Sequence, residues 1–169
     1  MQKIAPFPVI VAEEILTPRG EVMGLFLKEG IPSGLSVAET ISRIRAQNGL
    51  VSVPHPFDRF RPSAMDGETL TELAAQGQLD AIEVFNSRTP LYRSSNKAKL
   101  FARKYGLPAS AGSDAHTPYE VGNAYVEMPE FSGRDDFLEA LARGKIVGHR
   151  TNPLTHFNSI WARLRNNLR

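Results

Sequence analysis

The chain has 169 residues, of which 41% are hydrophobic and 22% are charged, and its formal net charge at neutral pH is +2. These values are typical of one soluble globular domain and exclude a disordered, collagen-like or disulfide-based protein. Because the chain contains no cysteine, it has no thiolate metal site and no cysteine nucleophile, and any metal ion must be held by nitrogen and oxygen atoms.

The positive excess is small, 20 Lys and Arg residues against 18 Asp and Glu residues, and these residues form no basic stripe. This distribution argues against a nucleic-acid partner. No apolar run approaches the ~20 residues that span a bilayer, and the first eight residues lack the apolar core of a signal peptide. We therefore expect a cytoplasmic protein without a membrane contact.

Short apolar runs alternate with amphipathic segments, which predicts the α/β class with a largely parallel sheet covered on both faces. The first strand is expected at residues 9–12. A turn signal at 18–20 separates it from a second apolar run at 22–27. The two runs are therefore close enough in sequence to pair as a hairpin.

A helix is expected over residues 36–48, because a capping box begins at Ser36 and apolar residues follow on one stripe. The next strand, 50–53, ends in a Pro-His-Pro sequence. Asp66 is placed to cap a second helix.

The alternation continues to the end of the chain. In order, the later elements are a strand at 81–85, a helix at 96–105, strands at 109–112 and 124–126, a helix from 132 through 141, a strand at 146–147, and a basic amphipathic helix at about 153–169. We predict one β/α domain over residues 1–150, with the helical segment 151–169 packed on it.

Potential metal ligands recur at or just beyond the ends of predicted strands. They are Glu14, His55, Asn86, Asp114 and His116. In parallel α/β architectures the carboxyl ends of the strands meet at the edge that carries ligands. The sequence therefore predicts a site at this edge.

Each of these residues also has a structural interpretation. Asp114 and His116 can share a metal if the backbone between them is extended, but Asp114 can instead cap the turn that begins at Thr117. The prolines around His55 hold it rigidly, which suits either a ligand or a structural turn. Glu14 either faces a cation or is an exposed residue.

Four motifs resemble the PHP (polymerase and histidinol phosphatase) family in their order and spacing, over about residues 9–126. They are Ala12-Glu13-Glu14-Ile15, Val53-Pro54-His55-Pro56-Phe57, Ile82-Glu83-Val84-Phe85-Asn86, and Gly112-Ser113-Asp114-Ala115-His116-Thr117 followed by Glu120-Val121-Gly122. Members of this family are mostly metal-dependent phosphoesterases with a distorted seven-stranded β/α barrel. The resemblance implies a partial barrel and the same chemistry for this chain.

The resemblance also implies roles for individual residues. Glu14 would bridge two metals, His55 would bind one of them, and Asp114 and His116 would bind different metals, so that these four residues form the catalytic centre. A further ligand would come from Glu83 or Asn86. The implied cofactor is one to three divalent ions, Zn or Mn, or else Fe or Mg.

The chain departs from the family pattern at its beginning. PHP domains open with a His-x-His pair, whereas here no histidine precedes His55. The chain therefore resembles about the last five strand–helix units. It could be a natural truncation, a fragment, a non-catalytic remnant, or one half of a split enzyme that works as a homodimer or with a missing N-terminal half.

The implied reaction is hydrolysis of a small phosphorylated substrate by water that the metal activates. Arg59, Arg61 and Arg88 follow the same strand ends and are candidates to bind the substrate phosphate. Their alternative role is that of solvated loop residues.

Overall fold

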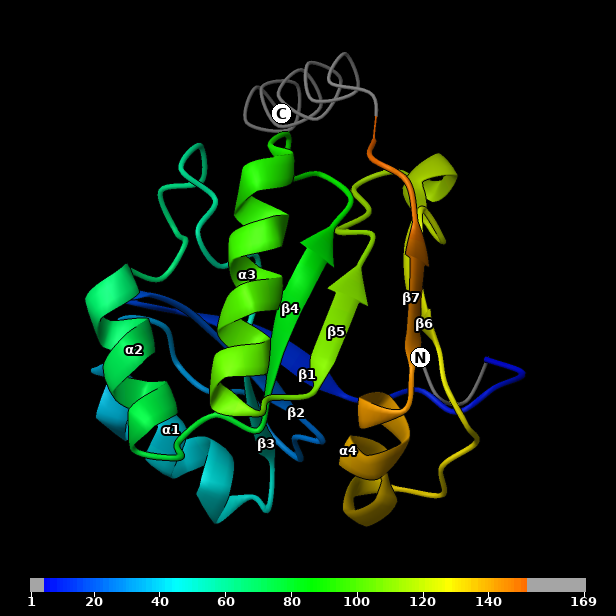
Figure 1. Cartoon of the computed structure of the whole chain (residues 1–169). Helices are drawn as coiled ribbons and strands as arrows, with labels where there is room; N and C mark the ends of the chain where they lie inside the picture. The colour runs from blue at the N-terminus through cyan, green and yellow to red at the C-terminus, as the bar shows by residue number, and fades with distance from the viewer. Residues whose placement is uncertain (1–4, 152–169) are drawn as a thin grey trace, which may run out of the picture.

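A mixed five-stranded sheet organises residues 5–151, the part of the chain that the computed structural model describes (Figure 1). The strands are β1 (Ala12–Thr17), β2 (Gly20–Leu25), β3 (Leu50–Val53), β4 (Ala81–Asn86) and β5 (Ala109–Gly112), adjacent in that order. The pairings of β1 with β2 and of β2 with β3 are antiparallel, whereas β3, β4 and β5 run parallel. The predicted α/β class is confirmed, but the sheet is less parallel than expected and does not close into a barrel within these residues.

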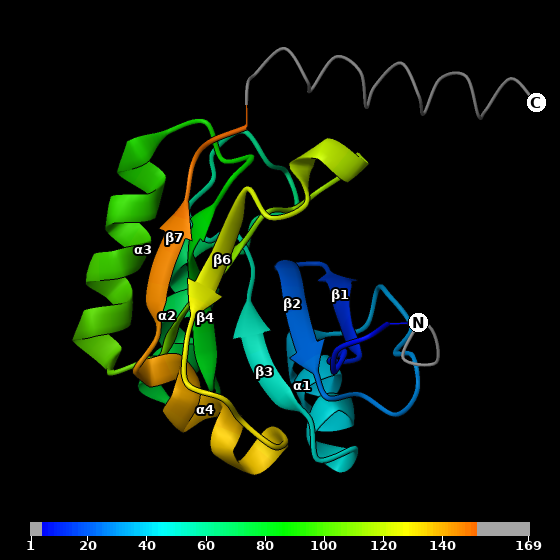
Figure 2. The same cartoon turned by 90° about the vertical axis from the view of Figure 1, so that its right-hand side faces the viewer.

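The remaining elements are four helices, a short 3₁₀ turn and a two-stranded ribbon within the described part. They are α1 (Val37–Ala46), α2 (Gly67–Ala75), α3 (Tyr92–Tyr105), η1 (Pro118–Glu120), β6 (Ala124–Glu127), α4 (Arg134–Ala142) and β7 (Lys145–Gly148). The antiparallel ribbon of β6 and β7 lies beside β5 (Figure 1), and Figure 2 shows the two strands of the ribbon from another side.

Local capping signals correctly predict where two helices begin. The side chain of Ser36 accepts a hydrogen bond from the backbone N–H of Glu39 at 3.2 Å, and that of Asp66 accepts one from Thr69 at 3.0 Å. Helix α3 starts at Tyr92, earlier than the expected residue 96, and no side chain caps its first turn.

Helices α1, α2 and α3 bury their apolar stripes in one core with the central strands. This core includes Ile41, Ile44, Leu70, Leu73, Ala98 and Ala102 from the helices and Val51, Val53, Ile82 and Val84 from β3 and β4. Phe137 and Leu141 of α4 instead pack with Leu50 and Ala81, the first residues of β3 and β4. Helix α4 therefore covers the amino ends of these strands, and their carboxyl ends lead into loops that can hold a site.

The predicted hairpin forms, but the first strand is shifted along the chain. It spans Ala12–Thr17 instead of residues 9–12, so the prediction that Glu14 follows a strand end was wrong. The shift arises because Thr17 pairs with Gly20 across a tight turn, which brings Ile15 opposite Val22. Both of these side chains are fully buried, and Glu14 lies on the other face of the strand.

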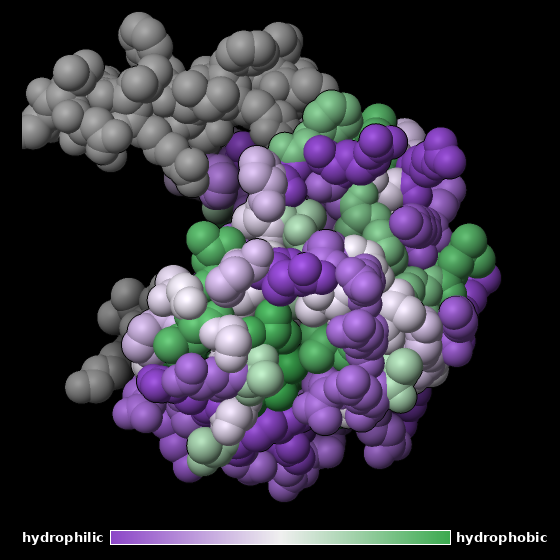
Figure 3. All heavy atoms as spheres, turned by 90° about the vertical axis from the view of Figure 1, so that its left-hand side faces the viewer, coloured by the Kyte–Doolittle hydropathy of each residue, from purple (hydrophilic) through white to green (hydrophobic). Residues whose placement is uncertain are grey.

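No helix among the described residues is long and apolar enough to cross a membrane. The face shown in Figure 3 is mainly hydrophilic, with apolar side chains gathered between the polar ones. The basic helix predicted at 153–169 lies outside the described residues.

The first turn of α4 offers a test of stability against pH. The carboxylate of Asp136 accepts hydrogen bonds from the N–H and Oγ of Ser132 at 2.8 and 2.7 Å and from the N–H of Gly133 at 2.9 Å. These bonds lower the pKa of Asp136 to about 2. Because this pKa is depressed, the carboxylate stabilises the fold above its ordinary pKa, and the contribution is lost as the pH falls toward about 2.

We therefore expect Asp136→Asn to lower the melting temperature by a few degrees at pH 7. Circular dichroism at several pH values should show the difference from wild type shrinking below pH ~4. The control is Asp135→Asn, since Asp135 contacts Arg134 only at the exposed surface. Equal melting temperatures for the two variants at pH 7 would contradict the assignment.

Candidate metal centre

Three side chains from neighbouring segments meet at one point beside the sheet. Glu14 lies in β1, Glu21 lies in β2 and His55 follows β3, and one possible ligand atom of each lies within 4.8 Å of the others. The register explains the meeting, because Glu14 pairs with Met23 and Glu21 is two residues from Met23 on the same face. Met23 also pairs with Ser52, so the antiparallel β3 brings His55 close to Glu21.

His55 is held in a geometry that suits a ligand. Its side chain is buried, Nε2 lies 3.0 Å from Oε2 of Glu21, and Nδ1 has no hydrogen-bond partner among the described residues. A buried imidazole nitrogen without a partner is costly unless something else satisfies it. A divalent cation fits this donor set, since two carboxylates and one imidazole are common ligands of Zn and Mn.

The pKa values of the two carboxylates of this group shift in opposite directions. Desolvation raises the pKa of Glu14, the neighbouring Glu21 and Asp114 raise it further, and the charges of His55 and Arg61 oppose the rise. Burial also raises the pKa of Glu21, but its polar contacts with His55 and Ser63 outweigh burial and leave that pKa lowered. Crowded acids of this kind are stabilised in their charged form by a cation.

Glu83 and Asn86 support His55 from behind. Oε2 of Glu83 accepts hydrogen bonds from the backbone N–H of His55 at 2.6 Å and from Nδ2 of Asn86 at 3.1 Å. Burial raises the pKa of Glu83 to about 7. Neither residue belongs to the group of Glu14, Glu21 and His55. Glu83 instead positions His55 by accepting a hydrogen bond from its backbone N–H.

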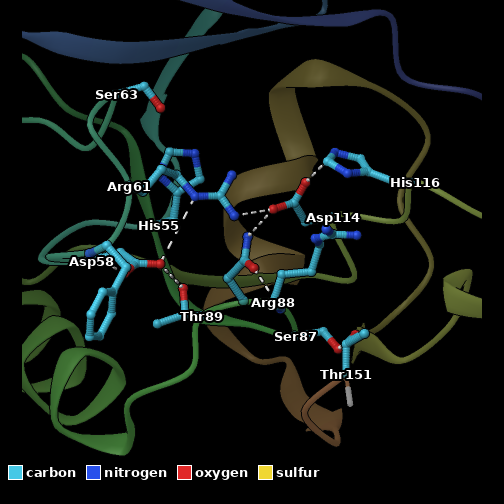
Figure 4. Close-up of polar contacts among 12 residues, drawn as sticks. His55, Asp58, Arg61, Ser63, Ser87, Arg88, Thr89, Asp114, His116 and Thr151 are labelled. Carbon is cyan, nitrogen blue, oxygen red and sulfur yellow. Dashed lines mark hydrogen bonds and ion pairs between the residues drawn. The ribbon is translucent and has the colours of Figure 1, made fainter. Parts of the chain in front are cut away.

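Asp114 and His116 lie next to each other and are joined to the loop after β3 by Arg61 (Figure 4). Nε2 of His116 lies 3.5 Å from Oδ1 of Asp114, and the guanidinium of Arg61 forms a close ion pair with Oδ2 of Asp114. Asp114 and His116 are not part of the three-residue group. The charge of Asp114 nevertheless contributes to the raised pKa values of Glu14 and Glu83. A guanidinium therefore supplies the positive charge beside this carboxylate.

The three candidate arginines have different surroundings. Arg59 is exposed, and Arg61 is partly buried beside Asp114. Arg88 is buried, and its Nη1 lies 2.7 Å from Oε1 of Glu120. Oε2 of the same glutamate accepts the N–H of His116 at 3.0 Å, so this ion pair holds the loop that carries His116.

The backbone is unusual at this edge. The backbone φ angles of His55, Phe57 and Asp114 are 31°, 65° and 50°. These values lie in the left-handed region, which residues other than glycine rarely adopt. Such conformations cluster at functional sites, where the surrounding structure enforces them.

Glu21 is the member of the group that sequence reasoning missed. It follows a turn glycine and looks like a solvated residue when it is read locally. The alternation along the predicted hairpin contains the missing signal, because Glu14 and Glu21 lie next to the buried Ile15 and Val22 and must face the opposite side.

Residues 93–146 match a family model that is described as PHP-associated. The matched residues agree with the resemblance of the four motifs to the PHP family.

Two curated relatives of this chain come from Methanocaldococcus jannaschii, and both are uncharacterized proteins. One is 42% identical over 124 residues, which are 73% of this chain and 52% of the relative. The other is 43% identical over 79 residues, which are 47% of this chain and 43% of the relative. The chain thus spans about half the length of these relatives.

One similar solved structure is a two-domain protein from Bacteroides vulgatus that contains a predicted PHP-like metal-dependent phosphoesterase. It has a TM-score of 0.62 and 22% sequence identity, over 83% of this chain and 44% of that protein. The likeness shows that this chain shares the fold of the matched part of that structure.

Proposed function

We propose that this chain contributes to a metal-dependent phosphoesterase that acts on a small phosphorylated substrate. The observation that carries the proposal is the meeting of Glu14, Glu21 and His55, whose buried Nδ1 has no hydrogen-bond partner among the described residues. The match of residues 93–146 to the PHP-associated family model and the likeness to the Bacteroides vulgatus protein that contains a predicted PHP-like metal-dependent phosphoesterase support the same reaction class.

The residues of the chain would divide the work in a simple way. Glu14, Glu21 and His55 would hold a divalent ion, Zn or Mn, or else Fe or Mg, and Glu83 would fix the backbone of His55. When bound, such an ion supplies Lewis acidity to a phosphoryl oxygen and makes hydroxide available near neutral pH. Arg61 lies beside Asp114 and could turn its guanidinium to a phosphate.

Asp114 and His116 are the candidates for a second ion, as the family resemblance implies. Because an arginine already pairs with Asp114, an ion there must compete with that guanidinium. We infer that the open sheet represents part of a PHP barrel. Further ligands would then come from another segment of the protein or from a second copy of the chain.

Metal loading followed by an assay tests this proposal. The purified protein is expected to bind at least one Mn²⁺ or Zn²⁺ per chain and to release phosphate from p-nitrophenyl phosphate, and chelation should stop the release. Glu21→Gln should weaken metal binding by at least ~100-fold, because even the loss of an outer partner costs 10–100-fold. The control is Glu29→Gln, whose side chain is exposed and outside the site. Wild-type protein that binds neither metal would defeat the proposal.

A further inference from the structure

A cavity lies beside the candidate metal centre, between the loop after β3 and the first turns of α3. Its volume is about 660 Å³. Its lining combines cationic side chains from the loop after β3 and from α3 with the apolar side chains of Phe57, Met65 and Leu91. The cavity is large enough for a small organic molecule with its charged groups.

The lining of this cavity is strongly positive. Four cationic side chains, Arg59, Arg61, Arg93 and Lys97, line it together with one carboxylate, Asp58. Within residues 5–151, Arg59, Arg93 and Lys97 have no acidic partner at ion-pair distance. The unpaired cations leave the cavity suited to an anion.

The single carboxylate of the cavity is already engaged. Asp58 is buried, its Oδ2 accepts a hydrogen bond from the hydroxyl of Thr89 at 2.9 Å, and its Oδ1 accepts one from the N–H of Phe60 at 3.1 Å. Nε of Arg61 lies 4.0 Å from the same carboxylate (Figure 4). Asp58 therefore organises the loop, and the three remaining cations stay available.

The start of α3 adds to this positive field. Leu91 precedes the helix without a side-chain cap, and the first turn contains no acidic residue. Both Leu91 and Ser94 line the cavity. The positive end of the helix dipole is thus not neutralised by the helix itself, and it reinforces the four side chains.

Two features connect the cavity with the proposed reaction. Arg61 lines the cavity and also pairs with Asp114, so the cavity adjoins the candidate metal centre. Phe57, Met65 and Leu91 give it an apolar part, and Nζ of Lys97 lies 4.3 Å from the centre of the Phe57 ring. An organic chain could lie on this apolar part between two charged groups.

We propose that this cavity binds a second, non-reacting phosphate group of the substrate. Its role in substrate choice rests on the proposed function, whereas phosphate binding itself does not. Arg93 and Lys97, one turn apart on α3, face the same cavity as Arg59 and Arg61 and would hold the phosphate by charge-assisted hydrogen bonds. The favoured substrates would thus be organic bisphosphates.

The first experiment uses the full chain without metal, in the presence of a chelator. Inorganic phosphate is titrated at low ionic strength, and binding is followed by calorimetry. The double variant Arg93→Ala/Lys97→Ala should bind phosphate at least ~10-fold more weakly than wild type. The matched control is Lys99→Ala/Arg103→Ala, which removes the same charge from the same helix at residues that line a different cavity.

The outcomes of this titration are distinct. A loss confined to Arg93→Ala/Lys97→Ala supports the site. Equal losses of affinity in both double variants would mean that phosphate binding depends only on the net charge of the protein. Absence of binding by wild type would mean that the cavity is not a phosphate site. Either result overturns the proposal.

The second experiment uses metal-loaded protein and compares 1,3-propanediol bisphosphate with 1,3-propanediol monophosphate. We expect wild type to favour the bisphosphate in kcat/KM, and the preference to fall at least ~10-fold in Arg93→Ala/Lys97→Ala but not in the control. An unchanged preference would refute the role in substrate choice. If neither compound is hydrolysed, the proposed function fails, and the metal-free titration still decides whether the cavity binds phosphate.

Discussion

Replacing His55 with asparagine is expected to lower metal affinity by more than ~100-fold while the chain remains folded. His55 supplies the only nitrogen of the three-residue group, and its φ angle of 31° is one that asparagine tolerates better than most residues. The backbone N–H would still donate to Glu83. Calorimetric titration with Mn²⁺ and Zn²⁺ measures the loss, and hydrolysis of phosphoesters should fall with it.

The control for this prediction is His149→Asn. His149 is exposed and lies outside the three-residue group, so its replacement should leave metal affinity unchanged. Circular dichroism checks that both variants are folded. Wild-type metal affinity in a folded His55→Asn variant would show that the ion is not held by these residues. If that variant does not fold, Glu21→Gln provides the same test from the other side of the site.

Gly112→Ala is expected to destabilise the protein by about 1–3 kcal/mol, the usual cost of overpacking. A Cβ atom on Gly112 would overlap Oε1 of Glu83. Glu83 is buried, and its Oε2 accepts hydrogen bonds from the backbone N–H of His55 and from Nδ2 of Asn86. Relief of the overlap would move Glu83 and release the backbone of His55. Metal affinity should therefore fall about 10-fold or more, as when a partner of a ligand is lost.

A double-mutant cycle isolates this overlap. In a Glu83→Ala background the added methyl group has room, so Gly112→Ala should cost clearly less there than in wild type, as measured by urea unfolding. Gly67→Ala is the matched control, because a Cβ atom at Gly67 meets no atom within 4 Å. Equal costs of Gly112→Ala in both backgrounds would rule out the contact with Glu83 as the cause.

Features that depend on a few adjacent residues could be predicted from the sequence. Ser36 and Asp66 cap their helices as expected, because a cap requires only a side-chain oxygen and the N–H groups of the next turn. The α/β class also follows from alternation along the chain. The beginning of α3 was misplaced since its first turn has no side-chain cap to mark it.

The site was harder to predict because it depends on register. The prediction placed Glu14 beyond a strand end, whereas it lies within β1. Glu21 meets His55 only because β2 pairs with both β1 and β3, and a shift of one residue would turn its side chain to the core. The surroundings of Arg88 depend likewise on Glu120, which lies 32 residues later and could not be inferred from the loop itself.

The position of β1 at the open edge of the sheet has a mechanical consequence. Glu14 and Glu21 place two carboxylates diagonally on one face of the hairpin, where like charges repel. A divalent ion bound by both carboxylates and by His55 would remove that repulsion and link the hairpin to the segment that carries His55. The concentration of divalent ions in solution would then govern both the rate of hydrolysis and the stability of the contact between the β1–β2 hairpin and the segment that carries His55.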